Sequence, residues 1–382
     1  PPPPPPPPPP PSFFQAEDVI LEHPRSRGLG DVYKRQDDKT PVEQDVVLET
    51  LVTDLTNPWG LVFLTDGSLL ITERPGQILH YDNGTVKIVG GVPDIISIGQ
   101  GGMLDIVAHP NFADNKLIYF TASVGSASAF STALFKAKFE SNQLKDVKKL
   151  FQADIKNNND KHFGSRIVFD KDGVVFVSFG ERGNSNSAQD LSNHNGTIIR
   201  LTDTGEVPLD NPFIANPNAK PEIWSYGHRN VQGLALHPIT GELWSHEHGP
   251  KGGDEINIVK KGSNYGWPLA TFGIDYDGSI ISNDTSSAGA EDPVYYWVPS
   301  IAPCGMNFYN SDTTPQWKGS LFLGALAGKH LNRITIEDQK VIGEERLFSG
   351  MARFRQVIQG PDGYLYFITE NPGNLYRVRP SN

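Results

Sequence analysis

Short apolar runs separated by polar turns recur along the chain after residue 45. In each of six segments, a first apolar run is followed by a polar turn and a second apolar run, a pattern that predicts a β-hairpin. The segments are WGLVFLTDGSLLITERPGQI from Trp59, MLDIVAHPNFADNKLIYFTAS from Met103, SRIVFDKDGVVFVSFGERG from Ser165, VQGLALHPITGELWSHEHG from Val231, CGMNFYNSDTTPQWKGSLFLGAL from Cys304 and RQVIQGPDGYLYFITENPGNLYRV from Arg355. Four of the turns place a glycine where a tight turn needs positive φ: Asp66-Gly67, Asp172-Gly173, Thr240-Gly241 and Asp362-Gly363.

The spacing of these hairpins indicates the architecture. They start roughly 45 to 70 residues apart, which is the range of propeller blades. We therefore expect an all-β, six-bladed β-propeller, and the alternative is a β-sandwich with repetitive hairpins. Helical periodicity is nearly absent; the segment LKDVKKLF, Leu144 to Phe151, is short and fits a helix or a strand.

The N-terminal stretch does not share this pattern. Residues 1–11 are all proline, and FFQAED and DVYKRQ, which bound the following stretch, resemble a translated sequencing adapter more than a gene product. We expect residues 1–40 to be a disordered, non-native segment and residues 41–382 to form the propeller domain. The alternative is a genuine disordered, proline-rich arm.

Composition and charge exclude some classes of partner. The 38 glycines and 31 prolines suit many short strands joined by tight turns. The net charge of -11 argues against binding to nucleic acid or to an anionic membrane. No stretch approaches the roughly 18 to 20 apolar residues needed for membrane insertion. Cys304 is the single cysteine, so neither an intramolecular disulfide nor a multi-thiolate metal site is possible.

Several polar segments fall where loops of different blades should meet at the mouth of a central channel. They are GQGG (99–102), KHFGSR (161–166), SYGHRNVQG (225–233), HEHGPKGGDEIN (246–257), GKH (328–330) and RFR (353–355). Arg353 and Arg355 are two apart and would share one face of a strand. With Arg229 and Lys329 they predict a cationic pocket for a ligand with several carboxylates. Scattered surface salt bridges are the alternative.

Two further segments carry candidate chemistry. His162 has no apolar periodicity around it and is a candidate general base, although a lone histidine is more often structural. The glycine-rich HGPKGGDEIN, with Asp254 and Glu255, offers carbonyl and carboxylate oxygens that suit calcium, without EF-hand spacing.

A zinc site is the weaker hypothesis. Five histidines raise it: His228, His237, His246, His248 and His330. Neither an HExxH motif nor a cysteine pair is present to support it.

Taken together, these motifs resemble the PQQ-dependent soluble aldose sugar dehydrogenases, which are relatives of the soluble quinoprotein glucose dehydrogenases (PQQ is pyrroloquinoline quinone). The resemblance runs from about Val46 to Val378. SYGHRNVQGLALHP, HGPKGGDEINIVKKGSNYGWP and WVPSIAPCGM carry it most specifically, and in this order they form a strong signature.

The resemblance implies roles for individual residues. His162 would be the catalytic base, and Arg229 would stabilise negative charge that develops at the quinone carbonyls. Gln100, Asn230, Lys329, Arg353 and Arg355 would bind PQQ. The carbonyls of Gly249 and Pro250 would hold the active-site calcium, which acts as a Lewis acid. Glu255 and the Tyr265 carbonyl would bind a second, structural calcium.

The implied function is oxidation of an aldose at its anomeric carbon to the lactone, with electrons passed to an external acceptor. The family also implies a periplasmic location and a monomer or homodimer. A calcium-dependent lactonase or esterase, and a non-catalytic propeller that binds sugar or protein, remain alternatives.

Three positions depart from the family pattern. Lys161 stands where the glucose enzymes have an acidic residue beside the histidine. Cys304 replaces a common serine, and Val298 lies near the place of an aromatic residue that lines the sugar site. These differences leave sugar specificity open.

Overall fold

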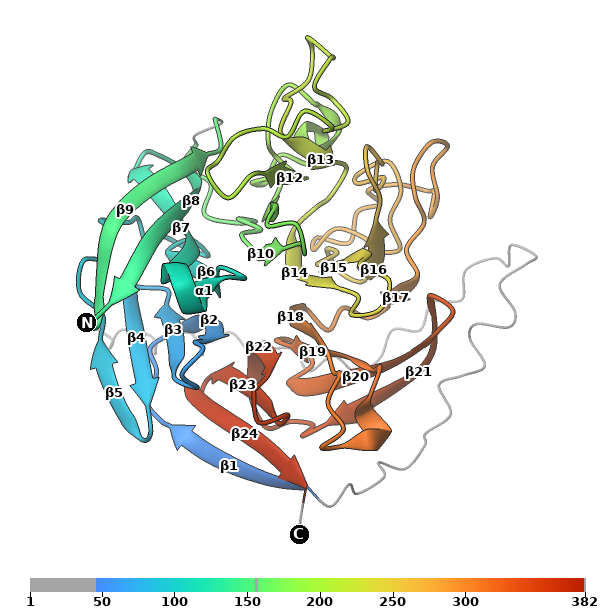
Figure 1. The fold of residues 1–382 in the computed structure, drawn as a ribbon. Helices are drawn as coiled ribbons and strands as arrows, with labels where there is room; N and C mark the ends of the chain where they lie inside the picture. The colour runs from blue at the N-terminus through green and yellow to red at the C-terminus, as the bar shows by residue number, and fades with distance from the viewer. Residues whose placement is uncertain (1–45, 155–156, 381–382) are drawn as a thin grey trace, which may run out of the picture. The chain divides into compact units, whose positions relative to one another are not determined.

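The computed structural model describes residues 46–154 and 157–380. Within them, the predicted hairpins belong to six four-stranded antiparallel sheets arranged in a ring (Figure 1). The structure confirms the predicted six-bladed β-propeller. The predicted segment 1–40, and residues 41–45 of the predicted domain, lie outside the described residues.

Each sheet is one blade. The strands of each blade are named from the inside outward, so the first strand of each is the inner strand, which lies nearest the centre of the ring in Figure 1. Blades 1 to 3 contain β2 (Pro58–Phe63), β3 (Leu69–Glu73), β4 (Gln77–Asp82) and β5 (Thr85–Ile88); β6 (Met103–Ala108), β7 (Leu117–Ser126), β8 (Ala129–Glu140) and β9 (Gln143–Gln152); and β10 (Ile167–Phe169), β11 (Val175–Phe179), β12 (Thr197–Leu201) and β13 (Ile223–Ser225).

Blades 4 to 6 follow the same order along the chain. They contain β14 (Val231–Leu236), β15 (Leu243–Glu247), β16 (Asp254–Val259) and β17 (Tyr295–Trp297); β18 (Pro303–Phe308), β19 (Leu321–Ala325), β20 (His330–Glu337) and β21 (Lys340–Leu347); and β22 (Arg353–Gln359), β23 (Leu365–Glu370), β24 (Asn374–Pro380) and β1 (Val46–Val52). The segment Leu144–Phe151 lies in β9, so its ambiguous pattern belongs to a strand.

Helices are short in the described part of the chain: α1 (Phe112–Asn115) and the 3₁₀ turns Ser185–Gln189 and Pro315–Trp317. No helix within the described residues is long and apolar enough to cross a membrane.

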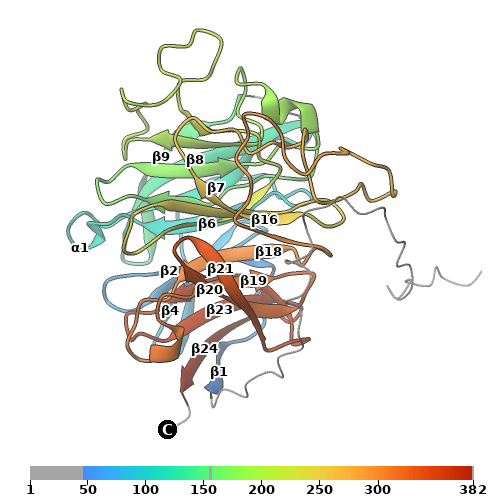
Figure 2. The ribbon, with the colours of Figure 1, turned by 90° about the vertical axis from the view of Figure 1, so that its right-hand side faces the viewer.

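The ring closes by pairing the two ends of the propeller. β1 runs antiparallel to β24, and the two strands lie side by side in both views (Figure 1 and Figure 2). The Arg377 Nη2 atom lies 2.6 Å from the Glu49 Oε2 atom across this pair. Because the first described strand completes the last blade, the sixth sheet gains a fourth strand and a covered edge.

Hydrophobic clusters fill the space between neighbouring blades. One of them joins Leu70 and Ile78 of blade 1 to Phe120 and Phe135 of blade 2, and all four are buried. Two-sided burial of this kind explains the apolar runs in the inner strands, where the outward-polar alternation of a one-sided sheet is absent.

Irregular register marks the inner strands. β2, β6, β14, β18 and β22 each shift register against their partner near the start of the strand. In β22 the shift falls between Phe354 and Gln356, so Arg355 is the extra residue. A β-bulge re-aims side chains, and here the bulged layer includes residues that meet near the ring's axis.

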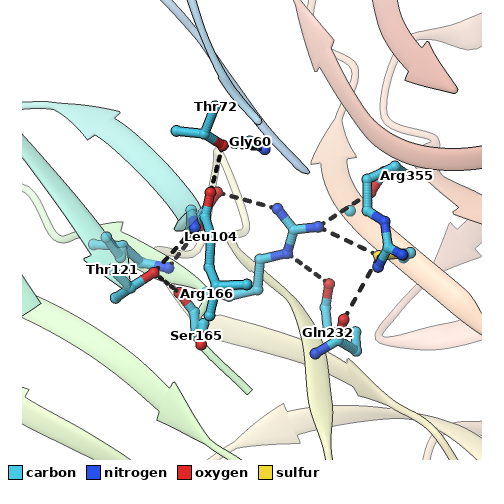
Figure 3. A network of polar contacts seen from close by, with 12 residues as sticks. Gly60, Thr72, Leu104, Thr121, Ser165, Arg166, Gln232 and Arg355 are labelled. Atoms are coloured by element: carbon cyan, nitrogen blue, oxygen red, sulfur yellow. Dashed lines mark hydrogen bonds and ion pairs between the residues drawn. The ribbon is translucent and has the colours of Figure 1, made fainter. Parts of the chain in front are cut away.

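Side-chain hydroxyls join successive blades just outside this layer. The Thr72 hydroxyl accepts a hydrogen bond from the Gly60 N–H in its own blade and donates one to the Leu104 carbonyl of blade 2 (Figure 3). Thr121 forms the same bridge between the Asp105 N–H and the Ser165 carbonyl of blade 3. These bridges fix the spacing between blades and satisfy backbone groups that the bulges leave unpaired.

One guanidinium connects all six blades. Arg166, just before β10 of blade 3, stacks 4.0 Å from the Trp59 ring centroid of blade 1. Its other contacts are the Asp105 carboxylate of blade 2 at 3.1 Å, the Gln232 carbonyl of blade 4 at 2.7 Å, the Cys304 sulfur of blade 5 at 3.4 Å and the Arg355 carbonyl of blade 6 at 3.1 Å (Figure 3). The Arg166 and Asp105 side chains are each only 3% exposed.

Arg166→Met is expected to lower the free energy of unfolding by about 3–5 kcal/mol, because it leaves the buried Asp105 carboxylate without its charged partner. Urea unfolding followed by tryptophan fluorescence measures the change. Lys171→Met is the matched control, since the Lys171–Asp172 pair is almost fully exposed, and it should change stability by less than about 0.5 kcal/mol. Equal effects of the two substitutions would contradict the prediction.

Candidate active site

The predicted site residues gather at one end of the inner strands. Gln100, His162 and Arg229 lie in loops just before the inner strands of blades 2, 3 and 4. Gly249 and Pro250 follow β15, Lys329 follows β19, and Arg353 begins β22. In a propeller all inner strands run in the same direction, so these loops share one end of the channel.

Three hydrogen bonds connect the loops that carry these residues. The His162 N–H donates to the Gln100 side chain at 2.9 Å, and the Gly164 N–H donates to the Asn230 side chain at 3.1 Å. The Arg229 Nη1 atom donates to the Gly249 carbonyl at 2.9 Å. The structure therefore places the predicted base and several predicted cofactor and metal residues in one assembly.

His162 is buried and held by a carboxylate that sequence reasoning missed. Its Nδ1 atom contacts the Oε1 atom of Glu181, which is 2% exposed. If Nδ1–H donates to this carboxylate, Nε2 is the unprotonated nitrogen. Burial lowers the pKa of His162 below its ordinary value, and the hydrogen bond to Glu181 opposes that shift, while Arg229 and Lys161 add to it.

The backbone around His162 requires glycine opposite it. A Cβ atom at Gly180 would lie 2.2 Å from the His162 carbonyl oxygen. Gly180 directly precedes Glu181, so the same close approach of backbones brings the carboxylate to the imidazole.

Arg353 and Arg355 share a second carboxylate that the sequence did not single out. The Arg355 Nη2 atom lies 2.7 Å from Glu370 Oε1, and the Arg353 Nε atom lies 3.4 Å from Glu370 Oε2. Burial raises the pKa of Glu370, but the two arginines outweigh it and the net shift is downward. The two side chains lie together as predicted, although the bulge at Arg355 interrupts the regular alternation on which that prediction depended.

Arg74 of blade 1 adds a cation that sequence reasoning missed. It is close enough to Glu370, Arg355 and Arg353 to feel their charges, and its Nη1 atom donates to the Gly99 carbonyl at 2.6 Å. Three guanidiniums around one carboxylate leave a local excess of positive charge.

Lys329 is exposed, and Arg353 contacts the same turn. The Arg353 Nη1 atom donates at 3.2 Å to the carbonyl of Leu326, three residues before Lys329.

These residues suit a ligand with several carboxylates. The Nε atom of Arg229 is buried and has no hydrogen-bond partner among the described residues, so a donor remains for a bound acceptor. Together with the excess positive charge near Glu370, this fits the polyanionic PQQ.

The glycine-rich loop borders a small cavity that carboxylate and carbonyl groups line together with the Arg229 side chain. The cavity holds about 10 Å³ and is lined in part by Glu247, Gly249, Gly253, Glu255 and Tyr265. That volume suits one water molecule or one ion.

The two acids at this cavity lie on paired strands. Glu247 and Glu255 are directly opposite in β15 and β16. Burial, and then the charge of Glu247, raise the pKa of Glu255 well above its ordinary value. Two adjacent carboxylates need a proton or a cation between them, and carboxylate and carbonyl oxygens are the ligands that calcium prefers.

Asp254 ties this loop to the next blade. Its Oδ1 atom accepts hydrogen bonds from the Gly249 N–H and the Ser300 hydroxyl, and its Oδ2 atom accepts from the N–H groups of Ile301 and Ala302. The same Ser300 hydroxyl lies 3.3 Å from the Pro250 carbonyl, so its single hydrogen is shared between these two acceptors. The Gly249 and Pro250 carbonyls are thereby fixed in place; each has a second lone pair, and together they could serve a cation.

The histidines considered for zinc have other partners. The His246 and His248 rings contact the carbonyls of Gly305 and Pro303, and His228 stacks on Tyr265. Across the described residues, no group of three or more His, Cys, Asp or Glu side chains could hold a metal ion.

Val298 is 51% exposed beside Gly252, near the loop of the small cavity.

Known proteins share this chain's sequence and fold over most of its length. The chain is 45% identical over 347 residues to the aldose sugar dehydrogenase YliI of Escherichia coli K12, covering 88% of this chain and 94% of that relative. The crystal structure of the soluble aldose sugar dehydrogenase of Escherichia coli in its apo form superimposes with a TM-score of 0.84 at 43% identity, covering 88% of this chain and 100% of that one.

A third relative was solved with its cofactor. The PQQ-bound aldose sugar dehydrogenase of Streptomyces coelicolor has a TM-score of 0.74 at 28% identity, covering 89% of this chain and 99% of that chain. The family model described as glucose/sorbosone dehydrogenase matches residues 55–377. The predicted relationship to the soluble sugar dehydrogenases is confirmed, and the chain belongs to the glucose/sorbosone dehydrogenase family.

Proposed function

We propose that this chain oxidises aldose sugars at the anomeric carbon to the lactone, using PQQ and calcium, and passes the electrons to an external acceptor. The observation that carries the proposal is the convergence of a carboxylate-held His162 and a cluster of guanidiniums at one end of the channel. The family's periplasmic location is part of the proposal.

His162 would take the proton of the anomeric hydroxyl on its Nε2 atom. Glu181 stabilises the imidazolium that forms and holds the ring in one orientation, as a carboxylate does for a general base elsewhere. When bound, PQQ would accept the hydride from the anomeric carbon, which is the redox chemistry that the cofactor supplies. The carbon thus loses a hydride and its hydroxyl loses a proton, which balances oxidation to the lactone.

The cations would bind and orient the cofactor. Arg353 and Arg355 both contact Glu370, so a carboxylate of PQQ would meet donors whose positions are fixed. Arg229 lies close enough to influence the pKa of His162, and from there it would stabilise negative charge opposite the base. The carbonyls of Gly249 and Pro250 would hold a calcium ion beside Arg229.

Reconstitution tests the proposal directly. The chain from residue 41 onward, stripped of metal and supplied with PQQ and calcium, should reduce an artificial dye in the presence of an aldose. Omission of either addition should abolish the reaction, and His162→Ala should lower kcat by at least about 100-fold. His237→Ala is the matched control and should retain activity, because His237 lies in the β14–β15 turn away from the site. No activity with a panel of aldoses and no PQQ binding by absorbance would favour the lactonase or binding-module alternatives.

The pH profile tests the electrostatics of His162. The base acts when neutral, so activity rises as pH rises through its pKa. Glu181 raises that pKa and Lys161 lowers it. Glu181→Gln should therefore move the acidic limb of kcat/KM to lower pH and reduce kcat about tenfold or more. Lys161→Gln should move the limb to higher pH. Shifts in the same direction would contradict this assignment.

Calcium should stabilise the fold through Glu255. A chelator in excess should lower the thermal midpoint of the wild-type protein, because a ligand at 100 times its Kd contributes about 2.7 kcal/mol to stability. In Glu255→Gln the chelator should have a clearly smaller effect. The exposed Glu140→Gln is the control and should respond like the wild type. An identical response of all three proteins would exclude Glu255 as a calcium ligand.

A further inference from the structure

A second cavity opens at the other end of the central channel. It holds about 310 Å³ and is lined by side chains from the inner strands of all six blades. One apolar residue from each blade is Leu61, Ile106, Ile167, Leu234, Met306 and Ile358.

The position of this cavity along the inner strands separates it from the candidate active site. The active-site loops precede the inner strands, whereas the cavity is lined by later residues of those strands, such as Phe63 and Gln359. The Arg166–Asp105 ion pair borders the cavity. On its other side, the Arg166 Nη2 atom contacts the Arg355 carbonyl and the Cys304 sulfur (Figure 3). Arg166 thus lies between this cavity and the predicted cofactor pocket.

The polar groups of the cavity are neutral as a set. The Asp105 and Arg166 charges offset each other at 3.1 Å, so a charged ligand would find no unpaired partner there. The other polar side chains at the cavity are the amides of Gln356 and Gln359. An ionised ligand would lose its hydration without compensation.

Hydrogen-bond acceptors and donors both remain at this end, because the amides of Gln356 and Gln359 supply N–H donors beside the Asp105 carboxylate. Arg166 already uses its Nε, Nη1 and Nη2 atoms in contacts with four other residues. Each Asp105 oxygen accepts one of the hydrogen bonds described, from Arg166 or from the Ile167 N–H, and a carboxylate can accept about four. A hydroxyl group, which can both donate and accept a hydrogen bond, therefore matches the polar groups at this end.

We propose that this cavity is a second binding site, for a small uncharged molecule with an apolar body and one hydroxyl group, such as an alkylphenol. Ligand pockets typically span about 300–1,000 Å³, with mainly apolar walls and a few polar groups that set orientation. The cavity has this make-up. The site does not depend on PQQ, calcium or the sugar reaction.

Isothermal titration of the full chain, loaded with PQQ and calcium, with 4-propylphenol tests the site. We expect saturable one-to-one binding. Propylbenzene, which has the same body without the hydroxyl, should bind about fivefold more weakly for loss of one hydrogen bond. Apoprotein should bind the phenol with the same affinity, which separates this site from the proposed cofactor pocket.

Substitutions at the cavity wall locate the binding. Ile358→Trp should abolish it by filling the space from blade 6, and Val62→Trp should do the same from blade 1 if the first variant does not fold. Ile342→Trp, on the outer strand β21, is the matched control and should bind like the wild type. Absence of saturable binding, equal affinity for propylbenzene, or binding retained in a folded cavity-filling variant would overturn the proposal.

Discussion

The buried guanidinium of Arg166, near the axis of the ring, constrains the positions of all six blades. Arg166 can lose its hydration only where other groups satisfy its donors and its charge. Those groups come from the five other blades: an aromatic face, a carboxylate, two carbonyls and a sulfur. A shift of any one blade would leave part of Arg166 or Asp105 unpaired. The contacts of Arg166 therefore fix the positions of the blades relative to one another. The apolar clusters between blades would fix them less precisely, because apolar side chains of similar size can replace one another.

The blades were predictable because their signals are local. Each hairpin is contained in about 20 consecutive residues, and the turn glycines lie within it. Arg74, by contrast, becomes a neighbour of the other site residues only when the ring closes, because it belongs to blade 1 and Glu370, whose charge it feels, belongs to blade 6. One signal was nevertheless present in the sequence. The second strand ends in a glutamate in blades 1, 4 and 6, at Glu73, Glu247 and Glu370, and Glu181 follows the second strand of blade 3 by two residues. Comparison of the hairpins with one another would have singled out this position.

These repeated carboxylates explain how an acidic chain maintains a cationic pocket. Glu370 lies between Arg353 and Arg355, and Glu247 accepts a hydrogen bond from the Arg229 N–H and contacts the His228 ring. Each carboxylate fixes the position of a nearby positive or donor group. Arg74 shares the charge of Glu370 with two other guanidiniums, and the Nε atom of Arg229 has no hydrogen-bond partner among the described residues, so positive charge and free donors remain at the channel end where the cofactor would bind.

The same balance determines the state of His162. Burial and the nearby Arg229 and Lys161 charges lower its pKa, and Glu181 alone among the named contributors raises it. A base in this environment is neutral near pH 7 and ready to accept a proton, yet the imidazolium that forms has a carboxylate in direct contact. Burial without Glu181 would make the ring a weaker base, and Glu181 without burial would raise its pKa. The close backbone approach at Gly180 allows both conditions, because it places Glu181 against the ring while the loop excludes solvent from it.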